Sequence, residues 1–155
     1  MAEKELTIKE ALDFAIGKHN EGKLREAEDI YKKILENEPN NADALHLLGV
    51  IAHQEGRYEE AIRNISRAIE LKPKCAFYYG NLGMTYDKLG KEEESARSFE
   101  KALEIDTKYD KAYLANYNLG VYLKDKGKVM EALEYYGKAI DLKKDFYDAH
   151  WNRGL

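Results

Sequence analysis

Hydrophobic residues between Ala42 and Lys74 recur every three or four positions, in two runs that meet near Gly56. This spacing places the apolar side chains on one face of a helix, with polar side chains on the other. Pro73 ends the second run, because proline cannot continue a helix. The pattern predicts two amphipathic helices joined at a glycine. Their apolar positions are Leu45, Leu48, Gly49 and Ala52, then Ala61, Ile65, Ala68 and Ile69.

The same pair of runs recurs along almost the whole chain. One column of positions is spaced by 34, 34, 37 and 34 residues: Ala15, Gly49, Gly83, Gly120 and Gly154. Four further columns keep this register and its single slip: Gly22, Gly56, Gly90 and Gly127; Ala27, Ala61, Ser95 and Ala132; Tyr31, Ile65, Phe99 and Tyr136; Ile34, Ala68, Ala102 and Ala139. Such a period is typical of stacked helical repeats, in which each pair buries its apolar face against the next. We therefore expect an all-α solenoid.

The third copy carries residues that match most of the pattern of a known repeat family. It resembles the tetratricopeptide repeat family at Tyr79, Leu82, Gly83, Tyr86, Ser95, Phe99 and Ala102. The resemblance extends over roughly residues 8–155. It implies a right-handed superhelical solenoid of antiparallel helix pairs, with about four repeats and a truncated fifth.

Local signals set the expected boundaries. We expect an N-terminal extension of residues 1–7 and repeats at about 8–41, 42–75, 76–109 and 110–146, followed by a partial repeat at 147–155. Thr7 and Glu10 have the spacing of a capping box, so the first helix is expected to begin near Ile8. The three extra residues fall between Thr107 and Tyr117, and we expect them to start the next helix about one turn early. The last copy stops within a helix, which favours a fragment of a longer array; the alternative is a short cap on the fourth repeat.

Composition narrows the classes of function. Hydrophobic residues make up 44% and charged residues 35% of the chain, and the net charge is −4. A nucleic-acid-binding protein needs a clustered basic face, and this charge gives no indication of one. No apolar run is long enough to span a membrane, and the charged opening segment is not a signal peptide. Cys75 is the only cysteine, which excludes an internal disulfide and fits a reducing compartment. We expect a cytoplasmic protein.

The resemblance places the first helix of every repeat along a concave groove, and this defines the candidate binding residues. One row is apolar and consists of Ile16, Val50, Met84, Val121 and Leu155; a second consists of Leu12, His46, Gly80, Tyr117 and Trp151; a third consists of Asp13, Leu47, Asn81, Asn118 and Asn152. His53 and Phe77 complete the candidate peptide-binding groove. Neighbouring copies set these side chains about 10 Å apart, the distance between packed helices.

The asparagines of the third row allow two interpretations. Asn amides at this interval could hydrogen-bond the backbone of an extended peptide, since each offers donors and an acceptor. Alternatively, they satisfy only backbone groups of their own helices. The apolar row likewise either forms a hydrophobic groove floor or is partly covered by adjacent helices.

Family resemblance also bears on the partner. Members that bind the C-terminal carboxylate of Hsp70 and Hsp90 chaperones carry Lys, Asn and Arg at set positions, of which this chain keeps only Asn81. A chaperone carboxylate clamp is therefore not expected. The Asn row and the segment from Ala42 to Ile62 instead resemble bacterial-type arrays and the repeat regions of O-linked N-acetylglucosamine transferase-like proteins.

Catalysis by these residues is not expected. His46 and His53 are seven residues apart, about 10 Å along a helix, which is too far to share a metal with bonds near ~2 Å. His19 and His53 occupy equivalent positions of adjacent repeats, but no Cys or carboxylate completes a ligand set. The glycines follow the repeat period and do not form a phosphate-binding loop. We expect no cofactor and no metal.

Three hypotheses of function follow. The leading one is a protein-interaction scaffold that holds an extended peptide or partner helix in its groove. The second is the substrate-recruiting segment of a larger, glycosyltransferase-like enzyme. The third is a self-assembling module, in which the unfinished helix around Trp151 stacks end to end on the first repeat of another copy.

Overall fold

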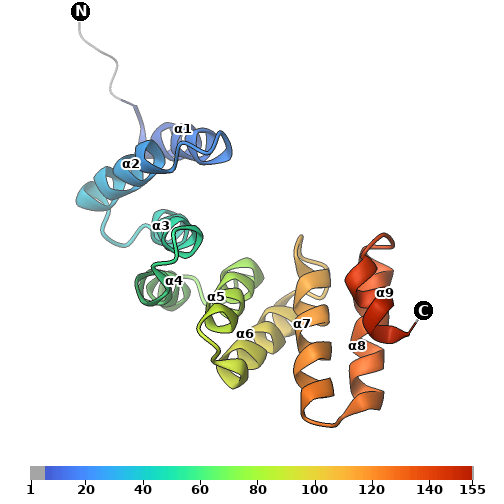
Figure 1. Cartoon of the computed structure of the whole chain (residues 1–155). Coiled ribbons are helices and arrows are strands. Elements are labelled where there is room, and N and C mark those ends of the chain that lie inside the picture. Colours follow the sequence, from blue (N-terminus) through green and yellow to red (C-terminus); the bar gives the residue numbers. More distant parts are fainter. Residues whose placement is uncertain (1–5, 155) are drawn as a thin grey trace, which may run out of the picture. The chain divides into compact units, whose positions relative to one another are not determined.

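The computed structural model describes residues 6–154, and every regular element in this range is a helix (Figure 1). The prediction of an all-α helical repeat is confirmed. The helices are α1 (Ile8–Asn20), α2 (Leu24–Asn37), α3 (Ala42–Gln54), α4 (Tyr58–Leu71), α5 (Ala76–Lys88), α6 (Glu92–Ile105), α7 (Ala112–Asp125), α8 (Val129–Leu142) and α9 (Tyr147–Arg153). Most of the expected extension, residues 1–5, and the groove candidate Leu155 lie outside the described residues.

The first helix begins as its sequence predicts. The backbone N–H of Glu10 donates to Thr7 Oγ1 at 3.2 Å, and the Thr7 N–H donates to Glu10 Oε2 at 2.8 Å. This capping box satisfies two backbone donors that the helix leaves unpaired. The Asn41 side chain caps α3 in a similar way, by accepting a hydrogen bond from the Ala44 N–H at 2.9 Å.

The turns within the helix pairs depend on glycine backbones. Gly22, Gly56, Gly90 and Gly127 follow α1, α3, α5 and α7, with φ between +70° and +77°. An L residue with a side chain rarely adopts this left-handed conformation. The recurring glycine therefore ends each first helix and starts the return.

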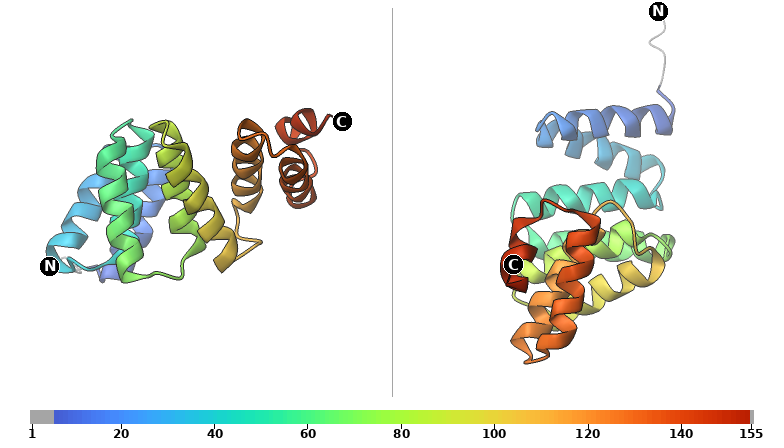
Figure 2. Two further views of the ribbon diagram at one scale, coloured as in Figure 1. Left: turned by 90° about the horizontal axis from the view of Figure 1, so that it is seen from below. Right: turned by 90° about the vertical axis from the view of Figure 1, so that its right-hand side faces the viewer.

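The chain divides into two compact units, Met1–Pro73 and Lys74–Leu155. The first unit holds α1 to α4, with a core of Ala15, Ala27, Tyr31, Ile34, Ala44, Leu48 and Ile51. The second holds α5 to α9, and two of its buried clusters are Ala96, Phe99, Ala115 and Leu119, then Ala139, Ile140 and Ala149. In the second unit α7 and α8 lie antiparallel and in contact along their length (Figure 2).

Close helix contacts explain the column of small residues. A Cβ at Gly49 would lie 2.7 Å from Ile65 Cγ1, and a Cβ at Gly120 would lie 2.5 Å from Tyr136 Cε1. Each of these glycines therefore faces the large residue of the second helix of its own pair. The two columns of the sequence pattern are the two sides of one contact.

The three-residue insertion is accommodated differently from the expectation. Helix α7 begins eight residues before Gly120, whereas α5 begins seven residues before Gly83, so the helix gains only one residue. The connection at residues 106–111 is correspondingly longer than that at residues 72–75. The expected extra turn was wrong because the added loop carries Tyr109 back onto α5, where a Cβ at Gly80 would lie 2.6 Å from the Tyr109 hydroxyl oxygen.

Within residues 6–154, none of the helices combines the length and the apolar character that crossing a membrane would need.

Candidate interaction surface

The first helices of neighbouring pairs meet within each unit. In the first unit, His19 Nε2 on α1 and Gln54 Oε1 on α3 are hydrogen-bonded at 2.8 Å. In the second, Asn152 Nδ2 on α9 donates to the Tyr117 hydroxyl on α7 at 3.3 Å. The outward side chains of α1 and α3, and separately those of α5, α7 and α9, form what we call the first-helix surface of each unit.

The apolar row of candidates is partly exposed on this surface. Ile16 and Val50 lie half-buried in the first unit, and Met84 and Val121 lie half-buried in the second. Leu12 and Leu47 are also half-buried and pack against the core of the first unit. The structure therefore leaves an apolar fraction of each row accessible to solvent.

The second row is divided between buried and exposed side chains. His46 is only 3% exposed, whereas Trp151 is 85% exposed. Tyr117 packs its ring 5.1 Å from the ring of Phe146, and burial, followed by Asp148, raises the pKa of its hydroxyl. In this row Trp151 is the one described side chain that is largely open to a partner.

Two amides of the Asn row donate to carbonyls of their own helices, and Asn152 is also bonded to Tyr117 on α7. Asn118 Nδ2 donates to the Leu114 carbonyl at 2.8 Å, and Asn152 Nδ2 donates to the Asp148 carbonyl at 2.9 Å. Asn81 is buried, at 8% exposure. These bonds agree with the interpretation that the amides satisfy backbone groups of their own helices. The carbonyl oxygen of Asn118 remains available to accept from a peptide N–H.

A small hollow of 80 Å³ opens between the first-helix surface of the second unit and α6. Asn118 and Val121 line it together with Phe99, Asp87 and Asp125. The two aspartates were not among the sequence candidates.

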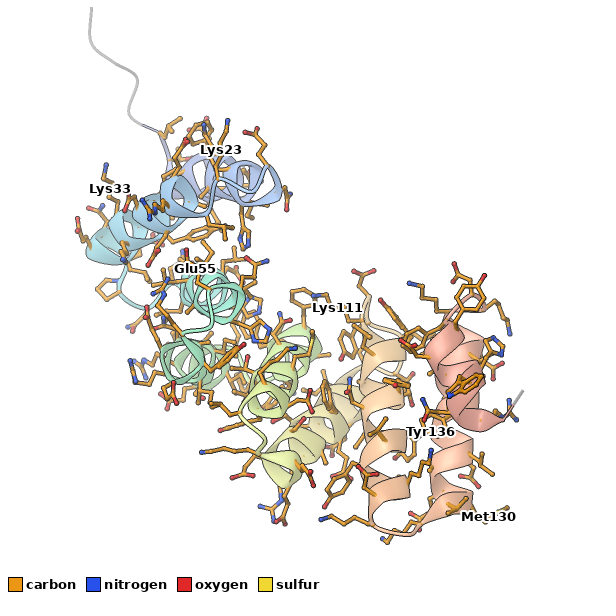
Figure 3. The ribbon with its side chains drawn as sticks, viewed as in Figure 1. Lys23, Lys33, Glu55, Lys111, Met130 and Tyr136 are labelled. Carbon is orange, nitrogen blue, oxygen red and sulfur yellow. The ribbon has the colours of Figure 1, made fainter. Side chains whose placement is uncertain are left out.

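Two further side chains near this surface were not among those candidates. Lys111, labelled in Figure 3, places its ammonium 5.3 Å from the centre of the Phe77 ring. Tyr109 fills the space in front of Gly80, and burial raises the pKa of its hydroxyl. Both belong to the lengthened connection, which interrupts the repeat pattern; the 37-residue interval was the signal that this region departs from the others.

The histidine side chains contact aromatic and amide groups. His53 stacks edge-on against Tyr58, with ring centres 5.6 Å apart, and His19 bonds to Gln54. Among the described residues, no group of three or more His, Cys, Asp or Glu side chains is placed to hold a metal ion.

Comparisons with known proteins agree on the architecture. Two family models described as tetratricopeptide repeat match residues 42–108 and 113–146. A crystal structure of MamA is similar, with 28% identity and a TM-score of 0.78, and the match covers 91% of this chain and 81% of that one. PilF of Pseudomonas aeruginosa shares the fold, with 23% identity, a TM-score of 0.83 and coverage of 94% and 65%.

A third similar structure belongs to a larger enzyme. The O-GlcNAc transferase of Thermobaculum terrenum matches with 29% identity and a TM-score of 0.75, over 89% of this chain and 27% of that one. A comparison with curated protein sequences gives no match. The family models and the matching helix pairs lead to one conclusion: this chain belongs to the tetratricopeptide repeat family.

Proposed function

We propose that this chain is a non-catalytic protein-interaction scaffold that binds an extended peptide or a partner helix along its first-helix surfaces. The observation that carries the proposal is the half-exposed apolar row, Ile16 and Val50 in the first unit and Met84 and Val121 in the second. Apolar side chains that remain accessible at the same repeat position provide a surface that a partner can bury. Membership of a family of repeat scaffolds supports the same function.

The partner's chemistry is restricted by the charges on the second unit. Asp87, Glu92 and Asp125 line the hollow beside Asn118, so a free carboxylate would meet three negative groups there. This supports the expectation that a chaperone C-terminal carboxylate is not the ligand. Affinity would come from the apolar row, and the carbonyl oxygen of Asn118 would orient a backbone N–H. The cytoplasmic location remains a prediction.

The test uses a peptide selected from a random display library on the purified protein. Its affinity is then measured by fluorescence anisotropy for Val50→Asp, Val121→Asp and the control Lys101→Ala, an exposed change on α6. A charge within the apolar row should weaken binding at least tenfold because the carboxylate would be desolvated by the peptide. Equal affinities for all three variants, with unchanged helical circular dichroism, would refute the proposal.

A second candidate is the recruiting segment of a larger enzyme, which would need catalytic residues elsewhere. The observation in its favour is the likeness to the transferase, of which the match covers 27%. Sequence on either side of this chain decides it: a catalytic domain would favour this candidate, and further repeats alone would exclude it.

A third candidate is self-association. Tyr147 and Trp151 on α9 are 81% and 85% exposed, and Phe14 on α1 is 54% exposed. Leu48 and Leu119, which hold the repeat position of Phe14 in later copies, are both buried, so another copy could cover Phe14 in a similar way. Light scattering over a hundredfold concentration range tests this candidate, and a constant monomer mass would remove it.

A further inference from the structure

A separate apolar hollow lies in the second unit, between α6, α7 and α8. Its volume is about 340 Å³, and the side chains of Leu103, Tyr135 and Leu142 form much of its wall. It is lined by α6, α8, the connection before α7 and Asn116 on α7, and shares no lining residue with the hollow at Asp87 and Asp125. It is therefore not part of the proposed peptide-binding surface.

The hollow coincides with a substitution in the repeat pattern. Asn116 lines it and occupies the column position at which the second and third copies have Leu45 and Tyr79. The corresponding junction of the first unit has a mixed polar and apolar lining and is bridged by an ion pair of 2.7 Å between Lys72 and Asp43. The smaller amide at position 116 removes apolar volume from the junction of the second unit and places a polar group in its wall.

Asn116 lines this space and carries one polar atom that the described protein groups do not pair. The residue is only 3% exposed, and its Nδ2 donates to the Ala112 carbonyl at 2.8 Å. Among the described residues, no donor is hydrogen-bonded to its carbonyl oxygen. In the described part of the chain, the buried side-chain polar atoms without a partner are the Tyr31 and Tyr136 hydroxyls, so the Asn116 oxygen is open to solvent in the hollow. A ligand that covers this oxygen must supply an N–H or O–H group, since otherwise the acceptor would lose its water without a replacement.

The charged residues of the lining are two lysines and one aspartate. Burial raises the pKa of the Tyr135 hydroxyl, and Glu100, Glu131 and Glu134 lie close enough to raise it further. Lys108 and Lys138 both line the hollow, and neither has a carboxylate partner among the described residues. The Lys138 ammonium instead lies 4.6 Å from the centre of the Tyr135 ring. Asp141, the remaining charged residue of the lining, is paired with Lys144 at 3.2 Å. Two amines that are not paired with a carboxylate favour a ligand with neighbouring carboxylates.

We propose that this hollow is a second binding site, which takes a tryptophan side chain of a partner protein, flanked in the partner's sequence by acidic residues. The volume lies at the low end of small-ligand pockets and suits one large side chain. The apolar walls receive the ring, the indole N–H donates to the carbonyl oxygen of Asn116, and the flanking carboxylates meet Lys108 and Lys138.

The test titrates the ¹⁵N-labelled protein with the peptide acetyl-Asp-Trp-Asp-amide and follows the backbone amide signals. Saturable shifts are expected at Leu103, Asn116 and Tyr135. The peptide with lysines in place of the aspartates should bind several-fold more weakly at low salt. The peptide carrying 1-methyltryptophan, which has no N–H, should bind about fivefold more weakly, the effect of one hydrogen bond.

Asn116→Leu supplies the key variant, because leucine is the residue found at this position in the second copy. It fills the hollow with an apolar side chain and should lower affinity for the peptide at least tenfold while keeping the melting temperature. Leu142→Glu, a change at the more exposed rim, removes apolar wall and repels the ligand's carboxylates, so it provides an independent loss of binding if the first variant misfolds. Val121→Asp should leave this affinity unchanged, which separates the site from the peptide-binding surface.

Three results would overturn the proposal: shifts confined to other parts of the protein, equal binding of the methylated peptide, or full binding by both Asn116→Leu and Leu142→Glu. An absence of any saturable shift up to millimolar peptide would also overturn it.

Discussion

At the scale of single residues, three aromatic side chains occupy equivalent positions but differ by a hydroxyl. Tyr31, Phe99 and Tyr136 each lie almost fully buried, at no more than 1% exposure. The hydroxyl oxygens of Tyr31 and Tyr136 are buried and have no hydrogen-bond partner in the structure. Burying such a group without a partner costs free energy, and Phe99 shows that the fold accepts the ring alone.

We predict that Tyr136→Phe raises the free energy of unfolding by about 1 kcal/mol, because it removes a desolvated hydroxyl without opening a large cavity. Chemical denaturation followed by circular dichroism measures the change. Tyr117→Phe is the matched control: its hydroxyl accepts from Asn152 Nδ2 at 3.3 Å, so this change should destabilise the protein by about 0.5 kcal/mol or more. A lower stability for Tyr136→Phe would contradict the prediction.

Tyr31 also predicts a dependence on pH. Burial raises the pKa of Tyr31 to about 12, above the value of about 10 for an exposed phenol. Between these values the unfolded chain releases the proton and the folded chain keeps it, so stability is full below pH 10 and falls as the pH rises towards 12. Denaturation series from pH 9 to 12 should show a smaller fall for Tyr31→Phe than for the wild type. Identical slopes would show that the hydroxyl is not protected.

At the scale of helices, the small-residue column sets how closely the two helices of a pair approach. Gly120 on α7 contacts the Tyr136 ring on α8, whereas a Cβ at Gly137, also on α8, would have Arg153 as its nearest neighbour, at 3.6 Å. The first glycine is required by a close contact, and the second is not. Adding a side chain at Gly120 should therefore destabilise the helix pair, whereas adding one at Gly137 should not.

We predict that Gly120→Ala lowers the free energy of unfolding by about 1–2 kcal/mol, because the strain of overpacking against Tyr136 exceeds the gain in helix propensity. Gly137→Ala, its control, should raise stability by about 0.5–1 kcal/mol, since alanine favours the helix and meets only ordinary contacts. Thermal and urea denaturation of both variants provide the measurement. Two changes of the same sign would show that the contact at Gly120 is looser than described.

At the scale of the whole molecule, helices differ in how many neighbours support them. In a linear array each pair is stabilised by the pairs on either side. Helix α9, at Tyr147–Arg153, is short and packs against α8, with its Tyr147 and Trp151 side chains largely exposed. Helix α7 packs against both α6 and α8.

We predict that amide hydrogen exchange is fastest in α9 among the helices of the second unit, and at least a hundredfold slower in α7. Short helices with few packed side chains open locally without global unfolding. Mass spectrometry of deuterium uptake, resolved to single helices, measures the difference. Equal protection of α9 and α7 in a monomeric sample would contradict the prediction, and protection of α9 that grows with protein concentration would instead favour self-association.

The sequence could predict the helices and their partners in detail because the repeat is periodic. A column such as Gly49, Gly83 and Gly120 constrains one contact several times over, and the capping box at Thr7 is a local interaction between neighbouring residues. The candidate surface was less predictable. Position alone placed His46 and Asn81 in a groove, but whether a side chain at that position is buried depends on the size of the residues that pack beside it.

The sequence by itself determined the family, the helix pairs and the glycine turns, since these arise from interactions a few residues apart or from contacts repeated in every copy. Only the tertiary structure decided the course of the lengthened connection, the return of Tyr109 onto Gly80 and the apolar hollow beside Asn116. Each of these occurs once, at the point where the repeat pattern is broken. Their geometry follows from how particular side chains fill the space between helices, and a periodic pattern carries no information about a contact that is not repeated.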